Sequence, residues 1–130
     1  MSEEYMDRLR WLPCLNVSGE EIPPYAVMFV TDTYDDGTLQ VDKPDEDRAT
    51  WPVVLNGPAA IPIDGYGSCT RDYPAKALCN GFTAGFCKTV SGSWEFGNDT
   101  SDVTGYYAIG AEVDGAALVV YSGRAGWPSA

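Results

Sequence analysis

Histidine is absent from this chain of 130 residues, and its absence narrows the chemistry that the protein can perform. Imidazole is the side chain that most often serves as a general base or a metal ligand at neutral pH. Without it, no serine or cysteine has the partner that would activate it as a nucleophile, and no spacing of the carboxylates singles out a catalytic pair. The sequence therefore predicts a protein that is not an enzyme and that carries no cofactor.

Long apolar segments are also missing. No run reaches the roughly 18 apolar residues of a membrane span, and the first residues carry acids where a secretory signal has an apolar core. We therefore expect no membrane association and a reducing cytosol during folding. The four cysteines, which include no C-x-x-C pair, are Cys14, Cys69, Cys79 and Cys87. Small buried side chains are favoured over a zinc site, and a bridge between Cys69 and Cys79 stays open for oxidising conditions.

Basic residues are few: 8 Lys and Arg face 19 Asp and Glu, which gives a net charge of −11. Such a surface repels nucleic acid, so no nucleic-acid partner is expected. It either keeps the protein soluble or complements a basic partner, and both interpretations stay open. The acidic run from Asp32 to Asp47 suggests a calcium loop that Asp32, Asp36 and Gly37 partly fit, but Tyr34 and Lys43 stand where oxygen ligands are required. A solvated hairpin without a metal is therefore favoured.

Many short strands are expected, because the chain contains 14 glycines and 9 prolines. Apolar and β-branched runs predict strands at residues 25–31, 38–41, 51–55, 61–63, 66–71, 75–79, 86–90, 93–96, 106–113 and 116–121, with a polar loop at 97–104. Asp35-Asp36-Gly37 and Asp114-Gly115 predict hairpin turns, since Asp-Gly tolerates positive φ. We expect an all-β fold, a small sandwich or barrel of short antiparallel strands, with a single β domain over residues 16–130.

Residues 2–12 are the one helical candidate. Ser2 can cap this segment, Met6 and Leu9 give it an apolar side together with Trp11, and Pro13 would end it. The segment is too short to be stable by itself. Residues 1–15 are therefore predicted to form an amino-terminal arm that packs on the body or on a neighbouring chain. Most other aromatic residues are expected in the core, whereas Trp11 and Trp127 are expected outside it.

Four motifs carry a family resemblance. They are N-x-S-G-E-x-I-P-P-Y-A-V-M from Asn16 to Met28, N-G-P-x-x-I-x-x-x-G-Y-G from Asn56 to Gly67, W-x-F-G from Trp94 to Gly97, and Y-x-I-G-A from Tyr107 to Ala111. In this pattern of turns and strand starts, the chain resembles small β-rich structural proteins of tailed phages. The resemblance covers most of residues 16–121. It implies a virion component made in the host cytoplasm, either a capsid cement or decoration protein or a neck or tail accessory.

The expected function is that of a virion structural subunit, a homo-oligomer that binds the major capsid or tail protein. The alternative is a carbohydrate- or receptor-binding module, which an exposed row of aromatic residues beside carboxylates would favour. For the structural function, we expect contacts through strand edges and the two Ile–Pro turns, because an unpaired edge accepts a neighbouring strand. The competing interpretation is that these turns only shape the monomer. The candidate contact residues are Met6, Leu9, Trp11, Glu20, Glu21, Ile22, Pro23, Ile61, Pro62 and Trp127.

Overall fold

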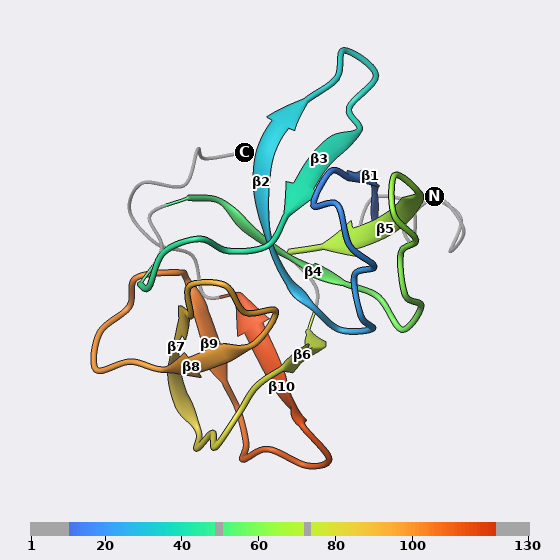
Figure 1. Cartoon of the computed structure of the whole chain (residues 1–130). Helices are drawn as coiled ribbons and strands as arrows, with labels where there is room; N and C mark the ends of the chain where they lie inside the picture. Colours follow the sequence, from blue (N-terminus) through green and yellow to red (C-terminus); the bar gives the residue numbers. More distant parts are fainter. Residues whose placement is uncertain (1–10, 49–50, 72–73, 122–130) are drawn as a thin grey trace, which may run out of the picture.

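The computed structural model describes residues 11–48, 51–71 and 74–121, and within these ranges the regular structure consists of β-strands alone. The all-β prediction is confirmed. The ten strands are β1 (Leu12–Asn16), β2 (Val27–Thr33), β3 (Leu39–Asp42), β4 (Val53–Asn56), β5 (Tyr66–Thr70), β6 (Ala75–Leu78), β7 (Gly85–Thr89), β8 (Phe96–Asn98), β9 (Tyr106–Ala108) and β10 (Ala116–Tyr121). They form a closed barrel and a second sheet beside it (Figure 1).

The barrel has the strand order β1-β3-β2-β4-β5 and closes where β5 pairs with β1. β1 and β3 are parallel, with Cys14 beside Leu39, whereas the other neighbours are antiparallel. The predicted turn between β2 and β3 is confirmed, since the Tyr34 N–H donates to the Thr38 carbonyl oxygen at 2.9 Å. Each of the five barrel strands has two neighbours, so the closed barrel does not present the open edges that we expected.

β1 corrects the predicted amino-terminal arm. Residues 12–15, which the prediction assigned to the arm, form barrel wall between β3 and β5. Pro13 is tolerated there because β3 pairs with β1 only from Cys14 onward, so Pro13 has a single strand neighbour, as in an edge strand. Met6 and Leu9 in residues 1–10, and Trp127 in residues 122–130, lie outside the described residues.

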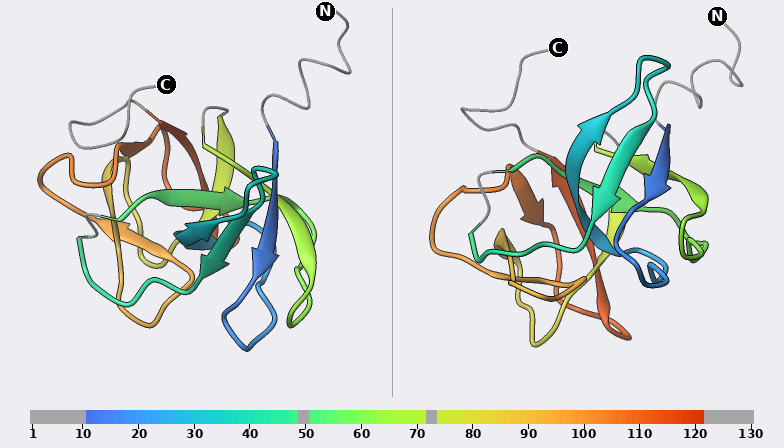
Figure 2. Two further views of the ribbon diagram at one scale, coloured as in Figure 1. Left: turned by 90° about the horizontal axis from the view of Figure 1, so that it is seen from above. Right: turned by 45° about the horizontal axis from the view of Figure 1, so that its top comes forward.

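The second sheet has the strand order β6-β10-β9-β7-β8, and it curls until Cys79 and Phe96 form a parallel bridge. It lies beside the barrel, with β7, β8 and β9 on the side away from β1 and β5 (Figure 2). The predicted Asp114-Gly115 turn is confirmed, with φ values of 54° and 83°. Some strand predictions were wrong: β9 ends already at Ala108, β8 occupies Phe96–Asn98 instead of residues 93–96, and residues 61–63 form only an isolated bridge at Ile61.

Two core clusters explain why β2 and β4 carry apolar residues on both faces. Val27 and Phe29 of β2, with Val53 and Leu55 of β4, pack against the second sheet. Met28, between the first two, packs in the cluster inside the barrel. A strand that is buried on both faces reads as a continuous apolar run, and not as an alternating one. These two strands are therefore the shared wall between the barrel interior and the second sheet.

The four cysteines are buried, as predicted. Cys69 packs with Cys14 inside the barrel, whereas Cys79 and Cys87 belong to the cluster between barrel and sheet. The bridge that was left open between Cys69 and Cys79 therefore does not form. Burial raises the pKa of Cys79 to about 11 and that of Cys87 to about 12. Because the thiolate is the reactive form, these protonated thiols act as small apolar side chains.

Candidate interaction surface

The two Ile–Pro segments lie against each other at one end of the barrel. Ile22 and Ile61 form an antiparallel bridge in which each backbone N–H donates to the other's carbonyl oxygen at 2.9 Å. The residue three positions after each isoleucine has a positive φ, 62° at Tyr25 and 58° at Asp64. The isoleucines are 0% and 2% exposed. The two side chains are therefore not available to a partner, which favours the competing interpretation that these turns shape the monomer.

Two buried asparagines, one at the start of each segment, hold this arrangement. Asn16 Nδ2 donates to a carbonyl oxygen of its own turn at 2.7 Å and to that of Pro62 at 3.0 Å. Asn56 Nδ2 likewise donates within its own turn at 2.9 Å and to the carbonyl oxygen of Pro23 at 2.9 Å. Pro23 is half-buried and Pro62 is exposed. The backbone carbonyls of both prolines are therefore occupied within the monomer.

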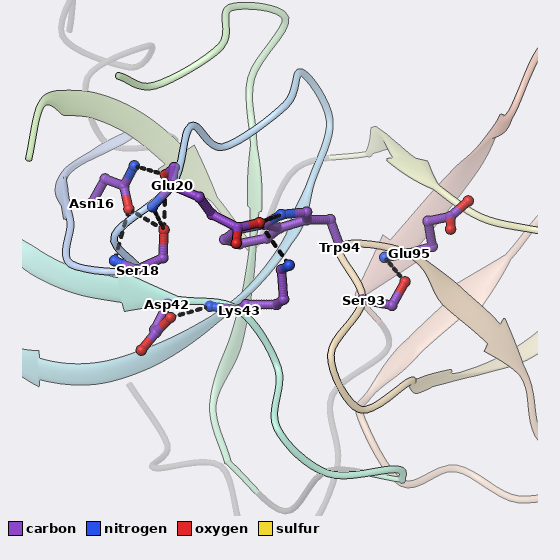
Figure 3. A network of polar contacts seen from close by, with 8 residues as sticks. All are labelled: Asn16, Ser18, Glu20, Asp42, Lys43, Ser93, Trp94 and Glu95. Carbon is purple, nitrogen blue, oxygen red and sulfur yellow. Dashed lines mark hydrogen bonds and ion pairs between the residues drawn. The ribbon is translucent and has the colours of Figure 1, made fainter. Parts of the chain in front are cut away.

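Glu20 is exposed, yet its carboxylate contacts two side chains from other parts of the chain (Figure 3). Its Oε1 accepts a hydrogen bond from Trp94 Nε1 at 2.9 Å and forms an ion pair with Lys43 Nζ at 2.6 Å. The hydrogen bonds from Lys43 and from Trp94 hold the pKa of this carboxyl below its usual range. Of the two glutamates predicted to contact a partner, Glu20 therefore has a structural link, while Glu21 is exposed beside it.

Trp94 joins the barrel to the second sheet. It lies in the connection between β7 and β8, but its side chain packs in the barrel cluster and is 9% exposed. Its carbonyl oxygen accepts the Val27 N–H at 2.8 Å, and the Lys43 ammonium lies 5.3 Å from its ring centroid. A second tie is the hydrogen bond from the Tyr106 hydroxyl to the Val53 carbonyl oxygen at 2.9 Å. The barrel and the sheet consequently pack as one unit.

Trp11 rests on the outside of the barrel, beside β5. A Cβ added at Gly57 would lie 3.2 Å from its ring, so the missing side chain at Gly57 makes room for the indole. Trp11 and Tyr66, which is 69% exposed, line a hollow of about 340 Å³ together with Ser68. The described residues around this hollow include no carboxylate. The condition that the sequence set for sugar binding, aromatic residues beside carboxylates, is not met there.

An apolar outer face on the second sheet was missed in the sequence. Strand pairing places Leu118 opposite Lys76 and Tyr107 opposite Phe86, and paired residues share one face of a sheet. Their neighbours along β9 and β10 are buried and point to the core. Tyr107 and Leu118 are 40% and 46% exposed. Ile109, whose N–H donates to the Leu118 carbonyl oxygen, is 54% exposed.

This outer face continues into a hollow of about 430 Å³ beside the turn that joins β9 and β10. Val113, which is 71% exposed, lines the hollow with Lys76, Asp114 and Leu118. The Lys76 ammonium lies 5.7 Å from the ring centroid of Tyr25, another lining residue. We call the surface formed by Phe86, Tyr107, Ile109, Val113 and Leu118 the hairpin face.

The charge of the second sheet differs from that of the whole chain. The five strands of this sheet contain Lys76 and Lys88 but no aspartate or glutamate, in a chain with a net charge of −11. An antiparallel sheet that faces water normally carries polar side chains on that side. Contiguous exposed apolar side chains rimmed by polar residues are typical of interaction sites. The hairpin face is therefore the candidate interaction surface.

The acids that partly fitted a calcium loop serve the β2–β3 turn. Asp36 accepts the Thr38 N–H at 2.9 Å, and Asp32 accepts the Thr33 N–H at 2.8 Å. Among the described residues, no three histidine, cysteine, aspartate or glutamate side chains gather in a way that could hold a metal ion. These two carboxylates thus have local roles in the turn.

Comparisons of the chain with models of known protein families, with curated proteins and with solved structures found no match. Within the part of the chain that the structure describes, no helix is long and apolar enough to cross a membrane. The function is therefore argued from the surface of the molecule itself.

Proposed function

We propose that this protein is a structural subunit of a virion, of the tailed-phage kind that its sequence resembles, and that it attaches to the major capsid or tail protein. It acts by binding and not by catalysis, and it joins the particle in the host cytoplasm. The observation that supports this proposal is the hairpin face. Tyr107, Ile109, Leu118 and Val113 are exposed by 40%, 54%, 46% and 71% on one side of the molecule.

Burial of these side chains sets the strength of the contact. Complete burial of a Val, Leu or Ile side chain contributes roughly 1.5–3 kcal/mol. Because about half of each side chain is already covered, the hairpin face contributes on the order of 4 kcal/mol before the cost of association. One such contact is weak, but many copies attached to a symmetric particle, each also touching its neighbours, gain from multivalency. This is suited to a subunit of a shell or tube.

The charge distribution supports the same surface. The net charge of −11 keeps free subunits apart and soluble. The strands that carry the hairpin face contribute only lysines to its charge. The carboxylates beside this surface come from the β9–β10 connection, where Glu112 and Asp114 flank Val113.

Co-sedimentation tests the proposal. The purified protein is mixed with shells assembled from the major capsid protein, or tubes assembled from the major tail protein, of the same gene cluster. We expect the wild type to pellet with one of them and Leu118→Asp to stay in the supernatant. Ile63→Asp is the matched control, because Ile63 is 57% exposed but lies on an Ile–Pro turn, and it should pellet like the wild type. A wild type that pellets with neither particle, or equal pelleting of Leu118→Asp, would reject the proposal.

The carbohydrate- or receptor-binding alternative would use the hollow between Trp11 and Tyr66, where two aromatic side chains meet. Tyr66→Ala separates the two proposals, since Tyr66 is 69% exposed and its loss should leave the barrel folded. Normal pelleting of Tyr66→Ala agrees with the structural function. Lost pelleting of Tyr66→Ala together with normal pelleting of Leu118→Asp would favour the alternative.

A further inference from the structure

We infer that Asn80-Gly81 is a site of covalent modification, at which the folded protein deamidates with Glu112 as the general base. The chain contains two Asn-Gly sequences, Asn56-Gly57 and Asn80-Gly81. At such a sequence the backbone nitrogen of the glycine can attack the side-chain carboxamide of the asparagine, because glycine has no Cβ that hinders the approach. The two sequences have very different surroundings in the structure, and this difference selects Asn80.

Asn56 is held in a conformation that does not react. It is the last residue of β4 and is 2% exposed, and its Nδ2 donates to the carbonyl oxygens of Pro23 and Ala59 at 2.9 Å each. The Trp11 ring covers the next residue, since a Cβ added at Gly57 would lie 3.2 Å from it. The nitrogen of Gly57 therefore reaches the carboxamide only when this part of the barrel opens.

Asn80 has none of these restraints. It lies in the connection between β6 and β7, and both Asn80 and Gly81 are exposed. In the part of the chain that the structure describes, the Asn80 carboxamide has no hydrogen-bond partner. Gly81 has a φ of 61°, and no other group lies within 4 Å of the position that a Cβ would occupy there. The carboxamide and the glycine nitrogen are thus free to approach each other in the folded protein.

Glu112 lies beside the proton that the attacking nitrogen must lose. The Gly81 N–H donates to Glu112 Oε1 at 3.2 Å. The backbone N–H of Glu112 donates in turn to the Phe82 carbonyl oxygen at 3.4 Å, which holds the β9–β10 connection against the β6–β7 connection. A general base must lie within hydrogen-bond reach of the proton that it removes, and the Glu112 carboxylate meets this condition.

The reaction needs water as its only co-reactant. The Gly81 nitrogen forms a bond to Cγ of Asn80 while its proton passes to the Glu112 carboxylate. The bond from Cγ to Nδ2 then breaks, the proton passes to the leaving nitrogen, and ammonia departs from a cyclic succinimide. Water opens this ring at either carbonyl carbon and leaves aspartate or isoaspartate. Both products add one negative charge to the net charge of −11, and isoaspartate also lengthens the backbone directly after Cys79, where the second sheet curls onto Phe96.

Peptide mapping of the aged, full-length protein tests the site. Trypsin releases residues 49–71 and 77–88, each of which contains a single asparagine, and mass spectrometry follows the replacement of the amide by an acid. The unfolded fraction of a stable domain is roughly 10⁻³–10⁻⁶, so in the native protein we expect residues 77–88 to convert at least about a hundredfold faster than residues 49–71. In urea, where both sequences are unfolded, the two rates should agree within about threefold.

Variants at fixed pH and temperature test the base. Glu112→Gln keeps an oxygen that accepts the Gly81 N–H but is no longer basic, so it should slow the native conversion of residues 77–88 about tenfold or more. Glu21→Gln is the matched control, because it removes an exposed glutamate beside an Ile–Pro turn, and it should convert at the wild-type rate. In urea all three proteins should convert equally.

The outcomes have separate consequences. Native conversion of residues 49–71 that is as fast as that of residues 77–88, or native protein in which neither peptide converts, would overturn the site. An unchanged native rate in Glu112→Gln, or equal slowing in Glu21→Gln, would overturn the role of Glu112 as the base. The experiment involves no shell or tube, so its result does not depend on the proposed function.

Discussion

Gly67 is the position where one added methyl group tests the packing of the barrel most sharply. It lies opposite Cys14 in the barrel wall, and a Cβ there would come within 2.6 Å of both Cδ1 and Cγ1 of Ile61. Ile61 is 2% exposed, and two backbone hydrogen bonds hold it to Ile22, so it has little room to move. Overpacking of this kind costs about 1–3 kcal/mol. For Gly67→Ala we expect about 2 kcal/mol and, at about 4 °C per kcal/mol, a melting temperature lower by roughly 8 °C.

Thermal unfolding followed by circular dichroism measures this effect against two further variants. Gly110→Ala is the matched control, because nothing lies within 4 Å of the added methyl group, and it should change stability by less than about 0.5 kcal/mol. Ile61→Val alone should cost about 0.5–1.5 kcal/mol. Combined with Gly67→Ala it should cost less than the sum, since Cδ1, one of the two atoms 2.6 Å from the new methyl group, is lost while Cγ1 remains. Additive costs, or an unchanged melting temperature in Gly67→Ala, would refute this reasoning.

Three further outcomes are expected. Gly105→Ala should destabilise the protein by more than about 2 kcal/mol in chemical denaturation, because the added Cβ would overlap the Tyr121 ring at a φ of 87°; a neutral result would contradict this packing. Burial raises the pKa of Cys79 and Cys87 from 9.0 to about 11 and about 12. The free energy of unfolding should fall as the pH rises above about 9, because there only the thiols of the unfolded chain ionise. A free energy of unfolding that stays constant from about pH 8 to about pH 10.5 in urea titrations would contradict this. The pKa of Glu20 is lowered in the folded protein, so its contribution to stability is complete above the usual carboxyl pKa and is lost as the pH falls through the lowered value. The stability of Glu20→Gln should therefore depend less on pH in acid unfolding than that of the wild type. Identical pH profiles for the two proteins would exclude a role of the Glu20 carboxylate in stability.

Hairpin turns were the part of the fold that the sequence predicted best. The turns at Asp35–Gly37 and at Asp114-Gly115 both appear in the structure. Their conformation depends on residues that are adjacent in the chain, chiefly on the tolerance of aspartate and glycine for positive φ. Local chemistry of this kind is readable without knowledge of any distant contact.

Pairing between distant segments could not be predicted from the sequence. The likeness of the two Ile–Pro segments was visible in the sequence, but the bridge between Ile22 and Ile61 depends on how the barrel closes. In the same way, the predicted helix over residues 2–12 rested on apolar spacing, whereas Leu12 belongs to a strand held by β3 and β5. Trp94 was predicted within a strand. It lies instead in the connection between β7 and β8, and its side chain packs in the core of the barrel.

The hairpin face shows why an interaction surface is difficult to find from a strand pattern. β10 carries apolar side chains on both of its faces, as β2 does. In β2 this pattern reflects burial on two sides, since Val27 and Met28 contact different core clusters. In β10 one of the two sides is exposed at Leu118. The sequence predicts that both faces are apolar, but only the tertiary structure tells which face lacks a cover within the monomer.

Hydrogen–deuterium exchange of the full-length protein, free and bound to shells or tubes of the same gene cluster, tests the proposed contact surface most directly. We predict that binding slows amide exchange in β6, β9 and β10 and in the turn at Asp114-Gly115. Exchange in the Ile–Pro turns, residues 16–24 and 56–65, should stay unchanged because these residues neither belong to the hairpin face nor line the hollow beside it. Protection confined to the Ile–Pro turns, with none in β9 and β10, would contradict the assignment of the hairpin face as the binding surface.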